Sequence, residues 1–168
     1  YRRPYSSEET ENANVSMRSE VLQKIKNNPR QLVITYPEAL SEQVLTPKEL
    51  QRKTLSIKKG DELSIDFVNE TLFDFGFRRV DFVSEPGEFA VRGGILDVHS
   101  YSHEEPFRIE FFGNEIDTIR SFDITSQRST QSLSAIDVLA NIEQKELDEK
   151  RQSLLSFIPR ESLICVQN

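Results

Sequence analysis

The sequence has 168 residues, of which 36% are hydrophobic and 29% charged, so the chain can bury a core and is not expected to be disordered. Its formal net charge of −7 gives poor long-range attraction for nucleic acid and favours a protein partner, although a local basic patch could still bind DNA. No apolar run approaches the roughly 20 residues that a membrane-spanning helix needs, so we expect no membrane partner.

The first part of the chain predicts one α/β unit of a larger sheet. Residues 1–12 are polar and predict an extended lead-in, and the apolar positions of 13–27 predict a helix that Pro29 stops. The run 31–36 predicts a buried strand. One such unit cannot bury both faces of that strand, so more of the sheet must come from elsewhere.

The next segments predict a short capped helix, a strand and a longer helix. Thr46 stands where an N-cap belongs, ahead of a proline at the first helical position, and 53–57 alternate as in a half-buried strand. Apolar residues at helical spacing over 68–75 predict the longer helix, which Gly76 ends in a left-handed conformation.

After this helix the hydrophobic period changes to two, which predicts an antiparallel meander joined by tight turns. The predicted strands cover 77–83, 89–92, 95–99, 107–112 and 115–122. Gly113-Asn114 forms a two-residue hairpin turn between the last two, since both residues tolerate positive φ. We predict an α+β fold, a two-layer sandwich in which the helix covers the apolar face of the sheet.

The end of the chain predicts a strand at 135–139, a helix from 144 that Pro159 ends, and a strand at 162–166. Cys165 lies in this last apolar run and is predicted to be a buried thiol. Because it is the single cysteine, it cannot form an internal disulfide, which favours a cytoplasmic location. Two ends with buried-strand character predict a domain inserted between pieces of a larger α/β domain.

Motifs for catalysis or cofactor binding are not evident in the sequence. It contains no phosphate-binding P-loop and no nucleophile elbow. His99 and His103 are predicted to be solvated loop imidazoles, because a zinc site would need about four such ligands. Carboxylates from separate strands could still converge. We expect no catalytic residue, metal or cofactor in this chain.

The strand 107–112 predicts a functional surface. If its first, third and fifth residues face the core, then Arg108, Glu110 and Phe112 share the outer face. Phe112 is explained either by local packing at the strand end or by a binding patch, since aromatic and arginine side chains are enriched in interface hot spots. Arg92 ends a neighbouring strand and could join this surface. Acidic neighbours weigh against a continuous basic track for DNA: Asp97, Glu110, Glu115 and Asp117.

Two segments, 82–98 and 107–129, closely resemble the transcription-repair coupling factor (Mfd) family. The excision protein UvrB has a related module, with a similar arginine-glycine strand and E-F-F-G-[DN]-E-I hairpin. The Gly93-Gly94 version of the turn and the ending 122–129 look like the coupling factors rather than UvrB.

The resemblance implies that 53–142 form a UvrB-like second domain, whose task is to recruit UvrA. Residues 1–52 and 143–168 would then be parts of the flanking first domain, a degenerate helicase-like fold into which the second domain is inserted.

The UvrA-contacting residues of the family are two arginines and a phenylalanine on this sheet, and they match Arg92, Arg108 and Phe112. The full-length family protein is an ATP-driven DNA translocase that removes stalled RNA polymerase. Its motor, with ATP and magnesium, lies outside this chain. The resemblance thus implies a non-catalytic adaptor. A DNA-contacting accessory module of a repair helicase is the alternative, and a hydrolase or ATPase is a remote third.

Overall fold

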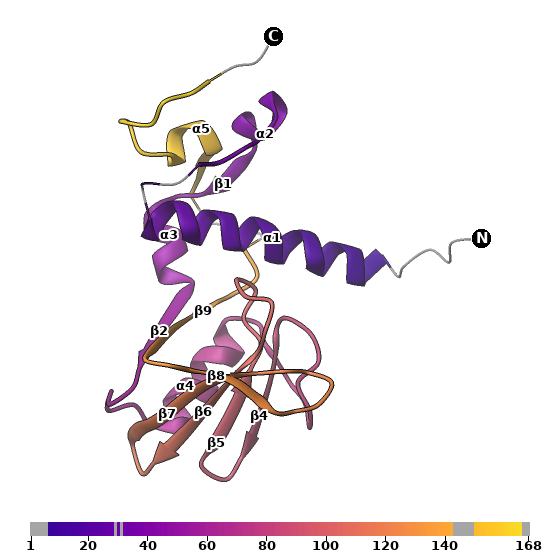
Figure 1. Ribbon diagram of the computed structural model, residues 1–168, viewed down its shortest axis with the longest axis vertical. Coiled ribbons are helices and arrows are strands. Elements are labelled where there is room, and N and C mark those ends of the chain that lie inside the picture. Colours follow the sequence, from indigo (N-terminus) through magenta and orange to yellow (C-terminus); the bar gives the residue numbers. More distant parts are fainter. Residues whose placement is uncertain (1–6, 29, 31, 143–149, 166–168) are drawn as a thin grey trace, which may run out of the picture.

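The computed structural model describes residues 7–28, 30, 32–142 and 150–165. Figure 1 shows a lower body built around a sheet, a long helix that crosses above it, and a smaller upper group of short elements. The helices are α1 (Ser7–Asn27), α2 (Pro37–Ser41), α3 (Pro47–Arg52), α4 (Ile65–Asp74) and α5 (Leu154–Phe157). Within the described residues, none of them is both long and apolar enough to cross a membrane.

The lower body contains a six-stranded sheet with the order β3-β4-β5-β6-β7-β8. Its strands are β3 (Arg78–Arg79), β4 (Glu88–Arg92), β5 (Ile95–Val98), β6 (Phe107–Phe112), β7 (Glu115–Phe122) and β8 (Ser129–Leu133). The predicted meander is confirmed from β4 to β7. The β3–β4 pair is parallel rather than antiparallel, and β8 was not predicted, because most of its residues are polar and exposed.

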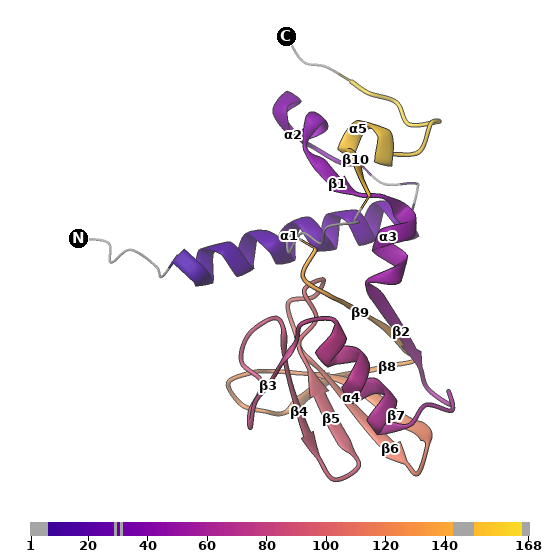
Figure 2. The ribbon, with the colours of Figure 1, turned by 180° about the vertical axis from the view of Figure 1, so that it is seen from behind.

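Helix α4 covers the inner face of this sheet, as the reverse view shows (Figure 2). The Ser64 hydroxyl caps its first turn by accepting a 3.1 Å hydrogen bond from the Phe67 amide. Val68 and Leu72 are fully buried in the core, and Gly76 follows the helix at a φ of +77°, as predicted. The predicted α+β, two-layer arrangement of this body is therefore confirmed.

The chain enters and leaves the lower body through two paired strands. β2 (Thr54–Lys58) is antiparallel to β9 (Ala135–Leu139), with Thr54 opposite Leu139. The Ala140 amide extends this pairing with a 3.0 Å hydrogen bond to the Lys53 carbonyl. The two connections therefore run side by side as one neck.

The residues that precede the lower body in the sequence and those that follow it pair with each other in the upper group. β1 (Gln43–Leu45) pairs antiparallel with β10 (Arg151–Ser153). Between β1 and the neck, α3 begins as predicted, since the Thr46 hydroxyl accepts a 3.3 Å hydrogen bond from the Glu49 amide.

Two predictions for the first part of the chain were wrong. The described part of the lead-in is helical from Ser7, because its glutamates are good helix formers and favour a helix N-terminus. Residues 32–36 form no strand, and Leu32 and Ile34 are exposed. A strand needs a partner, and no described strand pairs with this segment.

The C-terminal predictions also need correction. Residues 151–153 form a strand instead of continuing a helix, and α5 is a single turn. Residues 162–165 form no strand, and both Leu163 and Cys165 are exposed rather than buried. The helix and strand predictions over 143–149 and 166 fall outside the described residues.

Candidate partner-binding surface

A buried carboxylate organises the outer face of the sheet, opposite α4. Asp97 of β5 lies opposite Arg108 of β6, and its side chain is 1% exposed. It accepts two hydrogen bonds from the Arg108 guanidinium, at 2.7 Å from Nε and 2.9 Å from Nη2. Arg92 of β4 donates from Nη2 to the same carboxylate. Asp97 thus joins two of the three residues that the sequence singled out.

Arg108 is held from several sides. Its side chain is 17% exposed, its Nη1 donates to the Gln127 carbonyl at 3.3 Å, and its guanidinium lies over the Phe122 ring at 4.6 Å. The hydrogen bonds to Asp97 are the main reason why the pKa of Arg108 is raised above its ordinary value. Most of its hydrogen-bonding capacity is already used inside the protein.

Arg92 is the more accessible of the two arginines. Its side chain is 42% exposed, although Nη1 donates to the Asp81 carbonyl at 2.8 Å. The guanidinium also lies over the ring of Phe82, 5.5 Å from its centroid. Arg92 can therefore offer a positive charge to a partner without first losing its place on the sheet.

Phe112 projects from the end of the hairpin formed by β6 and β7. It pairs with Glu115 beside the Gly113 turn, where φ is +63°. The burial along β6 confirms the predicted alternation, with Arg108 and Glu110 on the outer face. Phe112 is 81% exposed, which contradicts the explanation by local packing at the strand end.

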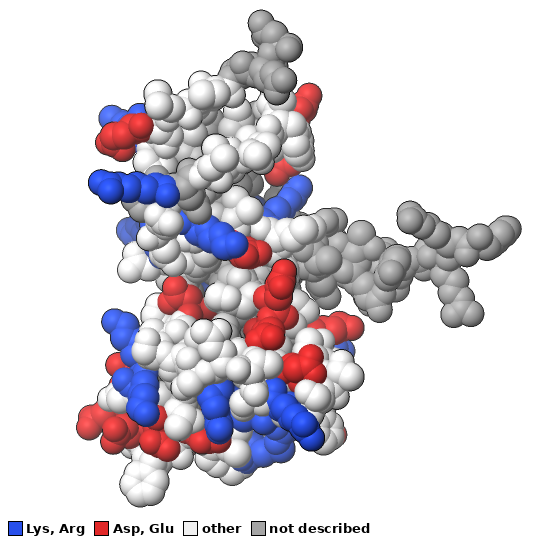
Figure 3. Space-filling view, viewed as in Figure 1, with Lys and Arg blue, Asp and Glu red and all other residues white. Residues whose placement is uncertain are grey.

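A second ion pair lies on the same face of the sheet. Arg120 donates to Glu110, which also accepts a 2.9 Å hydrogen bond from Thr118. Figure 3 shows basic side chains gathered over the lower body with acidic ones beside them. Because Asp97 and Glu110 bind Arg92, Arg108 and Arg120, the positive charges of these three arginines are already paired with carboxylates.

Two participants were missed or misread in the sequence. Asp97 was considered only as an acidic neighbour, although it holds both predicted arginines. Phe82 was assigned to a strand interior, yet it lies in the connection between β3 and β4 and is exposed. The sequence did contain a signal for Asp97. It alternates with the apolar residues Leu96 and Val98, so its side chain lies on the outer face of the sheet, opposite Arg108.

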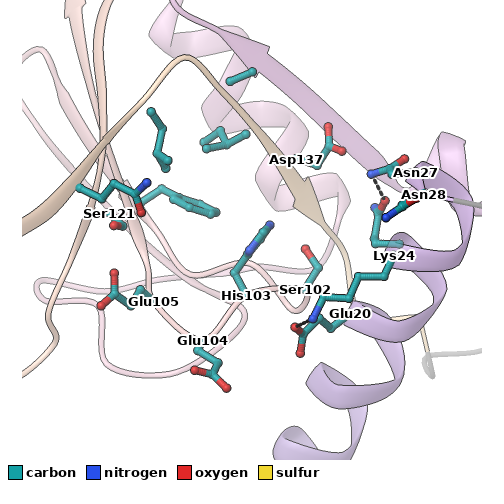
Figure 4. A pocket seen from close by; sticks show the side chains of 16 residues that line it. Glu20, Lys24, Asn27, Asn28, Ser102, His103, Glu104, Glu105, Ser121 and Asp137 are labelled. Carbon is teal, nitrogen blue, oxygen red and sulfur yellow. Dashed lines mark hydrogen bonds and ion pairs between the residues drawn. The ribbon is translucent and has the colours of Figure 1, made fainter. Parts of the chain in front are cut away.

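A separate hollow of 630 Å³ lies between α1 and the lower body (Figure 4). The side chains of Glu20 and Lys24 approach it from the helix, and His103, Glu104 and Asp137 from the body. Apolar residues form another part of the lining: Phe107, Leu133, Ala135 and Ile136. Within the described ranges there is no group of three or more His, Cys, Asp or Glu side chains that could hold a metal ion.

The two histidines differ in environment. His99 is buried, against the prediction of a solvated imidazole, and its Nε2–H donates to the His103 carbonyl at 3.2 Å. Burial lowers the pKa of His99 below its ordinary value, so it is neutral near pH 7. His103 is exposed, with its ring edge-on to Phe107 at 4.9 Å. These contacts support the loop between β5 and β6.

Comparisons with known proteins agree with this architecture. The family model described as the UvrB interaction domain matches residues 55–143, which is more than half of the chain. The transcription-repair-coupling factor of Haemophilus influenzae is 37% identical over 136 residues, covering 81% of this chain and 12% of that protein. Those of Bacillus subtilis and Escherichia coli are each 36% identical, covering 73% and 81% of this chain and 10% and 12% of those proteins. The chain therefore spans about a tenth of the length of these relatives, and it belongs to the UvrB interaction domain family.

Proposed function

We propose that this chain recruits UvrA in nucleotide excision repair, as the UvrA-binding part of a transcription-repair coupling factor. The observation that carries the proposal is an exposed Phe112 on the same sheet face as two arginines held by a buried aspartate, within the segment that matches the family. Arginine and aromatic side chains supply much of the binding energy in protein interfaces, which supports a protein partner.

The chemistry of the contact follows from how each side chain is held. Phe112 enters an apolar pocket of UvrA, because its ring is mostly solvated in the free chain. Arg92 and Arg108 face acidic or carbonyl groups of UvrA, and Arg92 makes the closer approach since it is the more exposed. The role needs no catalytic group, metal or cofactor in this chain.

In the longer protein, residues 53–142 are the UvrA-binding domain, and 1–52 and 143–168 are parts of its first, helicase-like domain. The pairing of β1 with β10 supports this division, because it joins residues that precede the lower body to residues that follow it. The ATP- and magnesium-dependent motor, and the contacts to RNA polymerase and DNA, belong to other regions of a much longer cytoplasmic protein.

A DNA-contacting module is the second candidate and is less well supported. Arg92, Arg108 and Arg120 on the outer face could bind phosphate groups of DNA. However, Arg92 and Arg108 are both paired with Asp97, and Arg120 is paired with Glu110. DNA binding would need these pairs to open, and the net charge of −7 opposes the approach.

Titration calorimetry of this chain with purified UvrA tests the proposal. Phe112→Ala should weaken binding by about thirtyfold, a typical loss for a hot-spot aromatic residue, without changing stability. Phe67→Ala is the matched control, because Phe67 is an exposed phenylalanine on α4, which covers the other face of the sheet. Equal affinity of the parent and Phe112→Ala would refute the assigned site, and no binding by the parent would refute the proposed function.

A further inference from the structure

Phe82 is a large apolar side chain that the fold leaves in water. It lies in the connection between β3 and β4 and is 68% exposed, whereas its neighbour Val83 is buried. Between β2 and β9 the other strongly exposed phenylalanines are Phe67 and Phe73 of α4, and Phe112. Phe82 and Phe112 are the two that do not belong to the covering helix.

The segment that carries Phe82 is firmly held. Val83 packs with Ala90 and Phe122 in a small cluster on the outer face of the sheet. Just beyond it, the amides of Ser84 and Glu85 donate to the buried carboxylate of Glu88 at 2.9 and 3.0 Å. An aromatic residue on such a fixed segment loses little conformational freedom when a partner covers it.

Phe82 is continuous with the arginine cluster. Arg92 lies over its ring, 5.5 Å from the centroid, and donates to the carbonyl of the preceding residue, Asp81, at 2.8 Å. Through Asp97, Arg92 is joined to Arg108 on β6, the strand that ends at Phe112. Phe82 thus belongs to a connected group of side chains that reaches Arg108, and Phe112 lies at the end of the strand that carries Arg108.

We propose that Phe82 is a further contact residue for the partner that binds this face, and that it binds as a pair with Arg92. The inference rests on the proposed function. One face of the Phe82 ring is taken by the guanidinium, and its open face accepts an apolar side chain of the partner. The partner surface that fits carries two apolar positions, for Phe82 and Phe112, with an acidic or carbonyl group between them for Arg92.

The test compares Phe82→Ala, Phe112→Ala and the control Phe67→Ala by titration calorimetry with UvrA. Phe82→Ala should weaken binding by about tenfold, between the control, which keeps parental affinity, and Phe112→Ala. Loss of binding in Phe112→Ala together with parental affinity in Phe82→Ala would overturn this inference and leave the proposed function intact. No binding by the parent would overturn both.

A double-mutant cycle separates direct contact from an effect through Arg92. If Phe82 touches the partner, Phe82→Ala still weakens binding at least threefold in an Arg92→Ala background. If the second substitution has no further effect there, Phe82 acts only by positioning Arg92, and the contact role is refuted. Phe82→Leu keeps apolar area without the aromatic face, and we expect it to retain part of the lost affinity.

Discussion

Replacing Asp97 by asparagine should destabilise the lower body, because the carboxylate is the counter-ion of two arginines. Asparagine has nearly the same shape but carries no charge. Arg108, with its bidentate contact and a side chain 17% exposed, would be left as a largely buried cation without its counter-ion. Arg92 is more exposed, so hydration by water compensates for much of the lost ion pair with Asp97.

The expected magnitudes follow from burial. Losing the partner of a largely buried charge is typically worth ~3 kcal/mol, and an exposed pair ~0.5 kcal/mol, so we expect Asp97→Asn to lower the free energy of unfolding by about 3 kcal/mol. In double-mutant cycles the coupling of Asp97 to Arg108 should be ~2 kcal/mol, and its coupling to Arg92 below ~1 kcal/mol.

Urea unfolding followed by far-UV circular dichroism measures these quantities, since the chain has no tryptophan to report by fluorescence. Phe112→Ala is the control, because its exposed ring should contribute little to stability. A change below ~0.5 kcal/mol in Asp97→Asn, or a coupling to Arg92 as large as that to Arg108, would contradict the view that Asp97 and Arg108 form the structural part of the surface.

Three further outcomes are expected. Gly87→Ala should lower the free energy of unfolding by ~3 kcal/mol in the same urea assay, because φ is +86° and an added Cβ would lie 2.7 Å from the Tyr101 Cζ. Gly113 also has a positive φ, but no atom lies near its added Cβ, so Gly113→Ala should lower the free energy of unfolding by only ~1 kcal/mol. Burial alone would raise the pKa of Glu88, but hydrogen bonds from Ser84, Glu85 and Arg78 hold this pKa below its ordinary value. The stability that Glu88 contributes is therefore present above pH 4.5 and is lost as the pH falls through its lower folded pKa, so Glu88→Gln should be less stable at pH 7, by ~2 kcal/mol, and should show a flatter acid limb in thermal melts between pH 5 and pH 3. In gel-shift titrations at low salt the chain should not bind duplex DNA, and a tight complex that weakens steeply with added salt would favour the DNA-contacting alternative.

The strands from β4 to β7 could be predicted because their local pattern agrees with their surroundings. Apolar residues alternate with polar ones, and turns rich in glycine separate the runs, so local sequence determines both the strand and its buried face. The strand β8 shows the limit of this reasoning. Ser129 to Ser132 are polar, and they form a strand because β7 offers an edge to pair with, which sequence periodicity does not reveal.

The strand predictions for residues 32–36 and 162–165 were wrong because these segments lack a neighbouring strand in the described part of the structure. Their apolar runs predict burial, but burial depends on a neighbour, and no strand among the described residues pairs with either segment. The apolar character of Leu32 and Leu163 therefore indicates only that these side chains are suited to a covered environment.

The candidate site divides in the same way. The outward position of Arg108 and Phe112 follows from the period of one strand, so the sequence was sufficient. The pairing of Asp97 with two arginines depends on the register of the strands β4, β5 and β6. The exposure of Phe82 depends on the path of the connection between β3 and β4. Both are properties of tertiary structure that no single run of residues encodes.

The neck formed by β2 and β9 also bears on how such a module can be inherited. Because Thr54 and Leu139 are cross-strand partners, both ends of the lower body emerge at one point, much as the ends of a hairpin do. A surface loop of an unrelated host protein could therefore accept the whole lower body as an insertion, without any change in the distance between the two ends of that loop. A genetic insertion of this kind would carry the whole sheet, with the proposed partner-binding surface, and would leave the core of the lower body and the core of the host unchanged.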